Sequence, residues 1–472
     1  MKRRVLAALL LALAAQAAHA DDTAGADIRA GRAALVAGRP QAALAHFQAA
    51  LERAGAARDA RFVALVGLGR AQLWLGAYAG ARESYARALP LAQTAADREA
   101  AATGLAQADN ALDYPRRAYA LVQAHARGRL EPTLEALKAQ RALGWQDLSL
   151  PYFAAMGAVP AQGRLGEEYA RLRADADYAV GKRVQGDFSY QHDSDNLTTW
   201  AYGAGVSLPG TPGGAWFPAW NLAAHAVWVN DGTQAAKVNI LDGGLEARIG
   251  RNQRLGLRLG AGERGGWSFL QGRAGWEYQP TDRFGLNAAA ERAPIYTPTA
   301  LGRHVLYDTY TLGVSLRPGA HWYVLPAAYH QDFSDGNRRD GGVLRVILSP
   351  YDLPGTASAL GAEFYGRVFR STMPGGGLGY FNPAHYDEAQ LSLIAIHRLA
   401  ADWRLRAQAG LGSQTADGAS AGTYALELTL QGRLPGNGRL SARLGRSNVA
   451  SVSGGGTGYW NNYLTLTLGY PF

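Results

Sequence analysis

The chain has 472 residues, a formal net charge of +9 and no cysteine. The length allows two or three domains, and the lack of cysteine excludes disulfide bonds and thiolate metal sites. The basic surplus is small and dispersed, so it does not indicate a nucleic-acid partner.

The first residues have the composition of a secretory signal peptide. Basic residues at positions 2–4 precede an apolar run from Val5 to Ala15, and Ala18-His19-Ala20 is a small-x-small cleavage site. We therefore expect residues 1–20 to be removed. No later window holds about 18 consecutive apolar residues, so a membrane domain would have to be a β-barrel.

The segment from about residue 21 to 176 has helical spacing and contains an internal repeat. The stretch that starts at Gly31 aligns with the stretch that starts at Gly69, so that small residues match small residues and Phe47 matches Tyr85. Small residues allow antiparallel helices to approach closely, and the aromatic ring fills the space between neighbouring pairs. The pattern resembles the tetratricopeptide repeat, which commonly presents a concave face to a partner. A plain helical spacer is the alternative. The predicted repeat core is Gly31, Ala43, Phe47, Gly69, Tyr78, Ala81 and Tyr85.

From about residue 177 the apolar period becomes two, in about sixteen segments of roughly ten residues, the length that crosses a bilayer in a closed barrel. The final stretch YLTLTLGYPF shows the same alternation. A soluble all-β domain would also alternate. However, short connections alternate with longer ones such as Ala293–His304 and Arg370–His385, as expected for a barrel with both chain ends in the periplasm. Aromatic residues at segment ends fit an interfacial girdle; they are Trp200, Tyr202, Trp276, Tyr278, Tyr463 and Tyr470.

The sequence therefore predicts an α + β chain of two domains. Residues 1–20 are the signal peptide, 21–176 a short tetratricopeptide-like helical domain in the periplasm, and 177–472 an antiparallel transmembrane β-barrel of about sixteen strands in the outer membrane of a Gram-negative bacterium. The last strand, with Tyr470 and Phe472, resembles the signal read by the barrel assembly machinery. That machinery and outer-membrane lipid are thus expected partners.

Three strings match active-site motifs but stand in the wrong context. The G-x-S-x-G at 418–422 places Ser420 in a loop between strands rather than at a strand-to-helix turn. The G-x-G-x-x-G at 260–265 continues a strand with no helix after it. The HDSDN at 192–196 is better explained by a polar hairpin turn than by a cation site. We expect no enzyme activity, no catalytic residue, no cofactor and no metal.

A barrel of sixteen strands leaves a water-filled lumen. The inward positions are polar and lean basic, which favours passage of an anionic or neutral chain. The alternative is that Arg–Glu pairs only hold the wall in shape. The predicted lumen-lining residues on a polymer path are Arg254, Arg258, Arg273, Glu277, Arg345, Glu363, Tyr365, Arg367, Arg404, Arg406 and Glu427.

The order of signal peptide, tetratricopeptide helices and large barrel resembles the outer-membrane exopolysaccharide exporters, which include the cellulose synthase operon C subunit and the poly-N-acetylglucosamine export porin. A loop with Gly379, Tyr380, Phe381, Asn382 and Pro383 is similar to a stretch in those barrels, although this chain has far fewer helical repeats. The resemblance implies a porin-like conduit that exports a polysaccharide chain for biofilm. Its helical repeats would dock periplasmic or inner-membrane synthesis proteins or guide the polymer. A surface receptor of the phage-adsorption type and a translocator of surface proteins are the alternatives.

Overall fold

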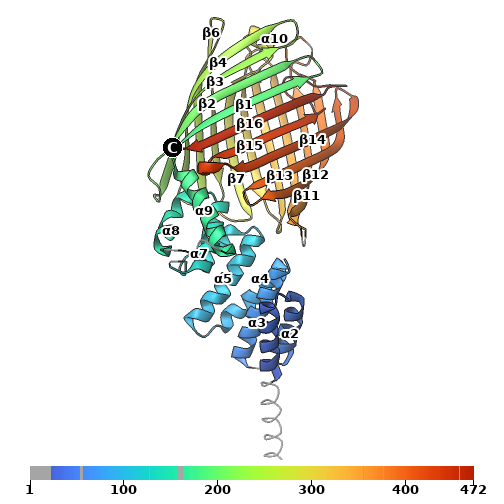
Figure 1. Ribbon diagram of the computed structural model, residues 1–472. Helices are drawn as coiled ribbons and strands as arrows, with labels where there is room; N and C mark the ends of the chain where they lie inside the picture. The colour runs from blue at the N-terminus through green and yellow to red at the C-terminus, as the bar shows by residue number, and fades with distance from the viewer. Residues whose placement is uncertain are drawn as a thin grey trace, which may run out of the picture. The chain divides into compact units, whose positions relative to one another are not determined.

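The computed structural model describes residues 23–53, 57–126, 128–157, 159, 163–353, 356–375, 377–456 and 458–472. The predicted signal peptide lies outside the described residues. The chain divides into two compact units, Met1–Arg173 and Ala174–Phe472. The first is helical and the second is a β-barrel (Figure 1).

The first unit is a series of helices in which each packs on the next. Its elements are a helix over 23–36, α2 (Pro40–Arg53), α3 (Arg58–Trp74), α4 (Tyr78–Ala88), η1 (Leu89–Leu91), α5 (Ala95–Ala111), α6 (Pro115–Val122), α7 (Leu130–Ala142), η2 (Gln146–Leu148) and α8 (Leu150–Met156). Helix α9 (Arg164–Val180) runs across the boundary between the units. None of the helices among the described residues is both long enough and apolar enough to cross a membrane.

Phe47 of α2 is the centre of the first repeat. Its side chain is fully buried and lies against two glycines. A Cβ atom added to Gly31 would lie 2.9 Å from the Phe47 ring, and one added to Gly67 would lie 2.4 Å from it. The small residues of the repeat are thus required because the ring occupies the space that larger side chains would need. Ala43, in the same helix, is also fully buried.

Tyr85 of α4 has the same role in the second repeat. It is buried, and a Cβ atom would lie 2.7 Å from its ring at Gly69 and 2.2 Å at Gly104. Ala81 is fully buried beside it, and Tyr78 is half-buried at the start of the helix. The aromatic ring therefore lies between α3 of its own repeat and α5 of the next.

The described residues of the second unit form sixteen strands that pair antiparallel in sequence order and close into a barrel. The strands are β1 (Arg183–Asp193), β2 (Thr198–Pro209), β3 (Trp216–Asn230), β4 (Ala235–Ile249), β5 (Gln253–Arg264), β6 (Trp267–Tyr278), β7 (Phe284–Pro294), β8 (Leu306–Leu316), β9 (Trp322–Phe333), β10 (Arg338–Asp352), β11 (Ser358–Ser371), β12 (His385–Ala400), β13 (Trp403–Ala416), β14 (Ala419–Arg433), β15 (Arg439–Ser447) and β16 (Asn461–Pro471). A short helix, α10 (Pro298–Gly302), follows β7, and a 3₁₀ turn, η3 (Pro435–Asn437), follows β14. The predicted fold class is confirmed.

The barrel closes where β1 pairs with β16, from Arg183 opposite Pro471 to Asp193 opposite Asn461. In this register Tyr470 lies opposite Val184 and Leu466 opposite Phe188, so the alternating apolar residues of the last strand continue the apolar face of the first. Closure leaves no unpaired strand edge, as a bilayer requires.

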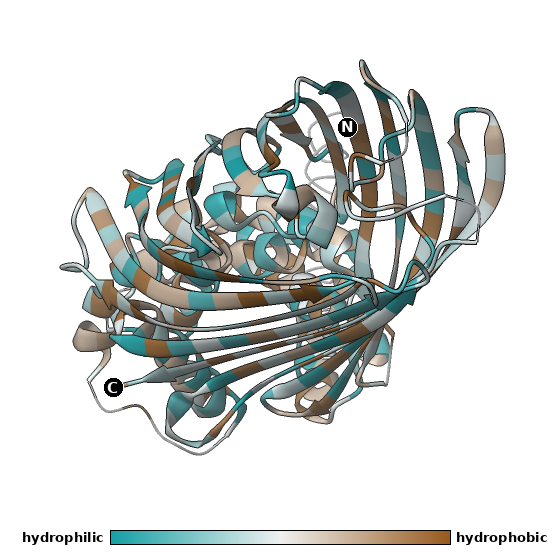
Figure 2. Cartoon of the chain, turned by 90° about the horizontal axis from the view of Figure 1, so that it is seen from above, coloured by the Kyte–Doolittle hydropathy of each residue, from teal (hydrophilic) through white to brown (hydrophobic). Residues whose placement is uncertain are grey.

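The two faces of the barrel wall differ in polarity, and Figure 2 shows the resulting alternation of hydrophilic and hydrophobic bands along the strands. The outer face carries exposed leucines; examples are Leu241, Leu259, Leu312, Leu393 and Leu411. The opposite face carries buried polar groups such as Asp242, Glu363 and Gln390. An apolar exterior around a polar interior is the pattern of a transmembrane barrel.

The predicted aromatic girdle needs one correction. The strand registers place Trp200, Tyr202, Trp276, Tyr278 and Tyr470 on the same face as the exposed leucines. Tyr463 instead lies on the inner face, opposite Gly445, because its position in β16 has the opposite parity.

The long connections lie at one end of the barrel. We name the end at which β1 begins and β16 ends the near end, and the opposite end the far end. The near-end connections span 210–215, 250–252, 279–283, 317–321, 353–357, 401–402 and 434–438, whereas the far end carries the longer loops 295–305, 372–384 and 448–460. We name these last three the far-end loops.

Candidate functional site: the barrel lumen

The strand registers place all of the predicted lumen residues on the inner face. They are Arg254, Arg258, Arg273 and Glu277 on β5 and β6, Arg345, Glu363, Tyr365 and Arg367 on β10 and β11, and Arg404, Arg406 and Glu427 on β13 and β14. Their role on a polymer path stays a prediction.

Some of these side chains brace neighbouring strands. The Arg345 guanidinium of β10 donates to both carboxylate oxygens of Glu363 on β11, at 3.0 and 3.1 Å from Nη2, and Glu363 is buried. On β5, Arg258 Nε lies 2.7 Å from Asp242 Oδ1, and the same carboxylate lies 3.0 Å from His225 Nε2. Such bidentate and shared pairs fix the geometry of the wall.

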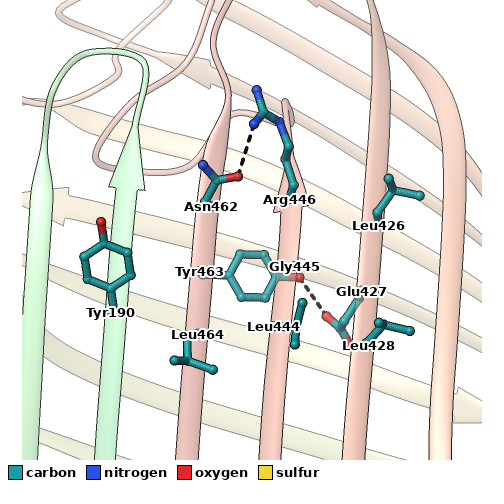
Figure 3. Close-up of a pocket in the computed structure, with 10 residues that line it drawn as sticks. All are labelled: Tyr190, Leu426, Glu427, Leu428, Leu444, Gly445, Arg446, Asn462, Tyr463 and Leu464. Carbon is teal, nitrogen blue, oxygen red and sulfur yellow. Dashed lines mark hydrogen bonds between the residues drawn. The ribbon is translucent and has the colours of Figure 1, made fainter.

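Glu427 of β14 is shared by two arginines. Arg406 Nη1 lies 3.3 Å from Glu427 Oε1 and Arg443 Nη2 lies 2.5 Å from Oε2. The Tyr463 hydroxyl donates to the same carboxylate at 2.8 Å, its ring covering Gly445 (Figure 3). One carboxylate therefore neutralises only one of the two guanidinium charges at this level of the lumen.

Two further predicted arginines face the lumen without a carboxylate partner among the described residues. Arg404 donates from Nε and Nη2 to the amide oxygen of Gln431, at 3.0 and 2.7 Å, and is exposed. Arg273 is exposed on β6, and the described part of the chain offers it no hydrogen-bond or ion-pair partner. Both charges are open to solvent within the barrel.

The far-end loops fold against the inner wall and against each other. Leu301 of the first loop is fully buried against Val229 and Val238, which face inward on β3 and β4. Phe381 of the second loop donates its backbone N–H to the carbonyl of Val452 in the third, at 3.0 Å. The loops therefore form a packed layer inside the far mouth rather than projecting from it.

The exporter-like motif 379–383 lies at the centre of this layer. Gly379 has φ +85°, and a Cβ atom there would lie 2.7 Å from the backbone nitrogen of Ala300 in α10. The Tyr380 ring stacks on Phe333 with centroids 4.9 Å apart and is buried, as are Asn382 and Pro383. The motif thus packs the loop layer onto the wall.

A polar network fixes the motif from the turn between β9 and β10, residues 334–337. The Asn337 amide donates to the Tyr380 hydroxyl at 3.1 Å and to Asn382 Oδ1 at 2.9 Å, and Asn337 is fully buried. Tyr380 in turn donates to Asp335 Oδ2 at 2.9 Å. Burial raises the pKa of Tyr380, so the hydroxyl stays protonated and keeps its role as a donor.

Two side chains that are absent from the predicted set hold the far-end loops from the inner wall. Arg339 donates to the carbonyl of Phe381 at 2.8 Å. Glu388 pairs at 3.0 Å with Arg367, which in turn donates to the carbonyl of Ala450 at 2.7 Å. Arg339 and Glu388 are both buried. Their inward strand parity was the available signal, but Arg339 contacts the carbonyl of a loop that has no periodicity, and Glu388 acts on a loop only through Arg367.

The three motif-like strings lie within β-strands or in the turns between them. Ser420 lies in β14, next to the turn rather than in a loop as predicted, and a strand follows it. The 260–265 string ends β5, and in the 192–196 turn Asp193 Oδ1 accepts the backbone N–H groups of Asp195 and Leu197, both at 3.0 Å. The described residues contain no group of three His, Asp or Glu side chains fit to hold a metal ion.

Comparison with known proteins places the barrel among outer-membrane structures. No protein-family model and no curated protein sequence match the chain. A bacterial polysaccharide outer membrane secretin is similar in fold, with a TM-score of 0.52 and 15% identity over 62% of this chain and 99% of that chain. Two further structures are more distant in fold. They are OccD3 (OpdP) of Pseudomonas aeruginosa (TM-score 0.35, 11% identity, 62% of this chain and 91% of that chain) and a loop-deletion mutant of OmpT of Vibrio cholerae (TM-score 0.36, 14% identity, 62% and 98%). With its closed sheet and apolar exterior, the chain carries a transmembrane barrel of the Gram-negative outer-membrane type, with the fold of a polysaccharide secretin.

Proposed function

We propose that this protein is an outer-membrane conduit that exports a polysaccharide. The observation that supports this proposal best is the closed barrel with its polar, arginine-lined inner wall. The barrel shares its fold with a polysaccharide outer membrane secretin over nearly all of that structure. A barrel of this strand number leaves an aqueous lumen wide enough for an extended polymer. No bond is made or broken in this role.

In this proposal residues 21–176 form a periplasmic domain and residues 177–472 the membrane domain. The helical repeats dock a periplasmic or inner-membrane synthesis protein, or guide the polymer to the near end. Stacked helical pairs such as those centred on Phe47 and Tyr85 support this role, because repeat arrays of this type present an extended concave surface to partners.

The polymer path is proposed to follow the inner face of β10–β15. It would pass the lumen residues from Arg404 and Arg406 to Arg345 and then the far-end loops. Because those loops are buried against the wall rather than projecting, their geometry suits control of a pore better than capture of a ligand from outside.

Deletion of the gene tests the proposal. We expect polymer to accumulate in the periplasm and to disappear from the cell surface, and the full chain supplied in trans should restore export. A variant that retains the barrel but lacks residues 21–176 should insert into the membrane yet export little polymer. Normal surface polymer in the deletion strain would refute the conduit, and loss of phage adsorption alone would favour a receptor.

A further inference from the structure

The inner face of β13–β15 carries a concentration of arginine near the near end. Arg404 and Arg406 lie on β13, Arg433 on β14, and Arg439 and Arg443 on β15. The registers make them neighbours: Arg433 lies opposite Arg439, while Arg406 and Arg443 both lie opposite Thr429. We name these five residues the arginine track.

The carboxylates available to the track are fewer than its cations. Arg433 and Arg439 both donate to Asp175 of α9, at 3.0 Å for Arg433, and Arg406 and Arg443 share Glu427. Arg404 has only the Gln431 amide. Among the described residues, Arg404, Arg406 and Arg443 thus have a single carboxylate partner between them, Glu427.

Bracing of the wall does not explain this excess, because one acid per base would serve for that purpose. The wall formed by β4–β6 shows the difference. On the inner face there, Asp242, Glu246 and Glu277 stand beside five arginines, which are Arg248, Arg254, Arg258, Arg264 and Arg273. The excess of arginine over acid is therefore present on that wall too, but it is larger at the track.

The guanidinium group determines which ligands the track could hold. Lysine and arginine carry the same charge, but only the planar guanidinium donates in the bidentate geometry that matches a carboxylate or a phosphate. Inward residues two positions apart on a strand are separated by about 6.6 Å, so Arg439 and Arg443 extend the track over roughly 13 Å of wall.

We propose that the arginine track binds the exported chain through carboxylate groups, so that the cargo is an acidic polysaccharide of the uronic-acid type. This inference rests on the proposed conduit function. Arg404 is the most available contact because it is exposed and engages only a neutral amide. The chain would exchange its own carboxylates along the track as it advances.

The test is channel block of the purified full chain in planar bilayers. A uronic-acid oligosaccharide and a neutral glucan oligosaccharide of equal length are added to either side, and ion selectivity is measured in parallel. We expect anion selectivity and block by the oligouronate at lower concentration than by the neutral chain. Arg404→Gln should raise the blocking concentration of the oligouronate about tenfold, as expected for loss of one charge-assisted contact.

Arg446→Gln is the matched control, since Arg446 is also an exposed arginine of the same wall and donates to the neutral groups of Tyr424 and Asn462, but lies on the outer face of β15 opposite Leu426. It should leave block by the oligouronate nearly unchanged. Equal block by both oligosaccharides, or equal effects of the two substitutions, would refute the binding of carboxylates by the arginine track. Neither result would contradict the proposed conduit function. Failure of the conduit itself would appear separately, as normal export in the deletion strain.

Discussion

Tyr380→Ala should loosen the far-end loops and raise the conductance of the barrel. The side chain is 7% exposed, stacks on Phe333 and joins the network of Asn337 and Asp335. Truncation of a buried aromatic ring to alanine costs about 3–5 kcal/mol. If this cost destabilises only the packed state of the loops, a loss of about 4 kcal/mol raises the population ratio of unpacked to packed loops by a factor of roughly a thousand.

Single-channel recording in planar bilayers measures the effect, as higher mean conductance and more frequent transitions between levels. Tyr380→Phe keeps the ring but loses both hydrogen bonds, so it should give a smaller change of the same sign. Tyr351→Ala removes a tyrosine that is 45% exposed on β10 and should leave conductance unchanged. Wild-type conductance and noise in Tyr380→Ala would refute the view that the loop layer limits the pore.

Three further predictions concern the helical repeats, each read out by hydrogen exchange of the helices in the full chain. Phe47→Ala should destabilise them by about 3–5 kcal/mol because the ring is fully buried, whereas Val36→Ala, at a side chain 91% exposed, should change little. Gly69→Ala forces a methyl group to within 2.7 Å of the Tyr85 ring and should cost about 1–3 kcal/mol through overpacking, and unchanged protection would show that the ring can move away. Thr94→Ala removes the capping box at the start of α5 and should cost about 1 kcal/mol, seen first as faster exchange in the opening turn.

The barrel wall was predictable because its information is local. A period of two in a segment such as Leu255–Leu259 assigns each side chain to the inner or the outer face of the wall. The pairing register then follows from closure of the sheet into a barrel. The same holds for the repeat core, where Phe47 and Tyr85 recur at equivalent places. In both cases the sequence pattern has the same period as the structural unit, which is two residues in a strand and one helical pair in the repeat array.

The far-end loops could not be predicted in this way. Asn337 and Asn382 form one buried network although 45 positions separate them, and neither stands in a periodic segment. The motif 379–383 stands out in the sequence only through its resemblance to the exopolysaccharide exporters, which gives no indication that it packs inward. Arg339 lies on the inner face by simple alternation, yet its partner is a loop carbonyl that alternation does not locate.

The seam between β1 and β16 has a consequence for biogenesis. Val184 and Tyr470 are partners, so the first strand to leave the ribosome stays without one neighbour until nearly all of the sheet has been made. During that interval its backbone N–H and C=O groups need a temporary substitute, since hydrocarbon offers none. A chain without β16 would therefore leave those groups of β1 unpaired at an open edge of the sheet, which hydrocarbon does not tolerate.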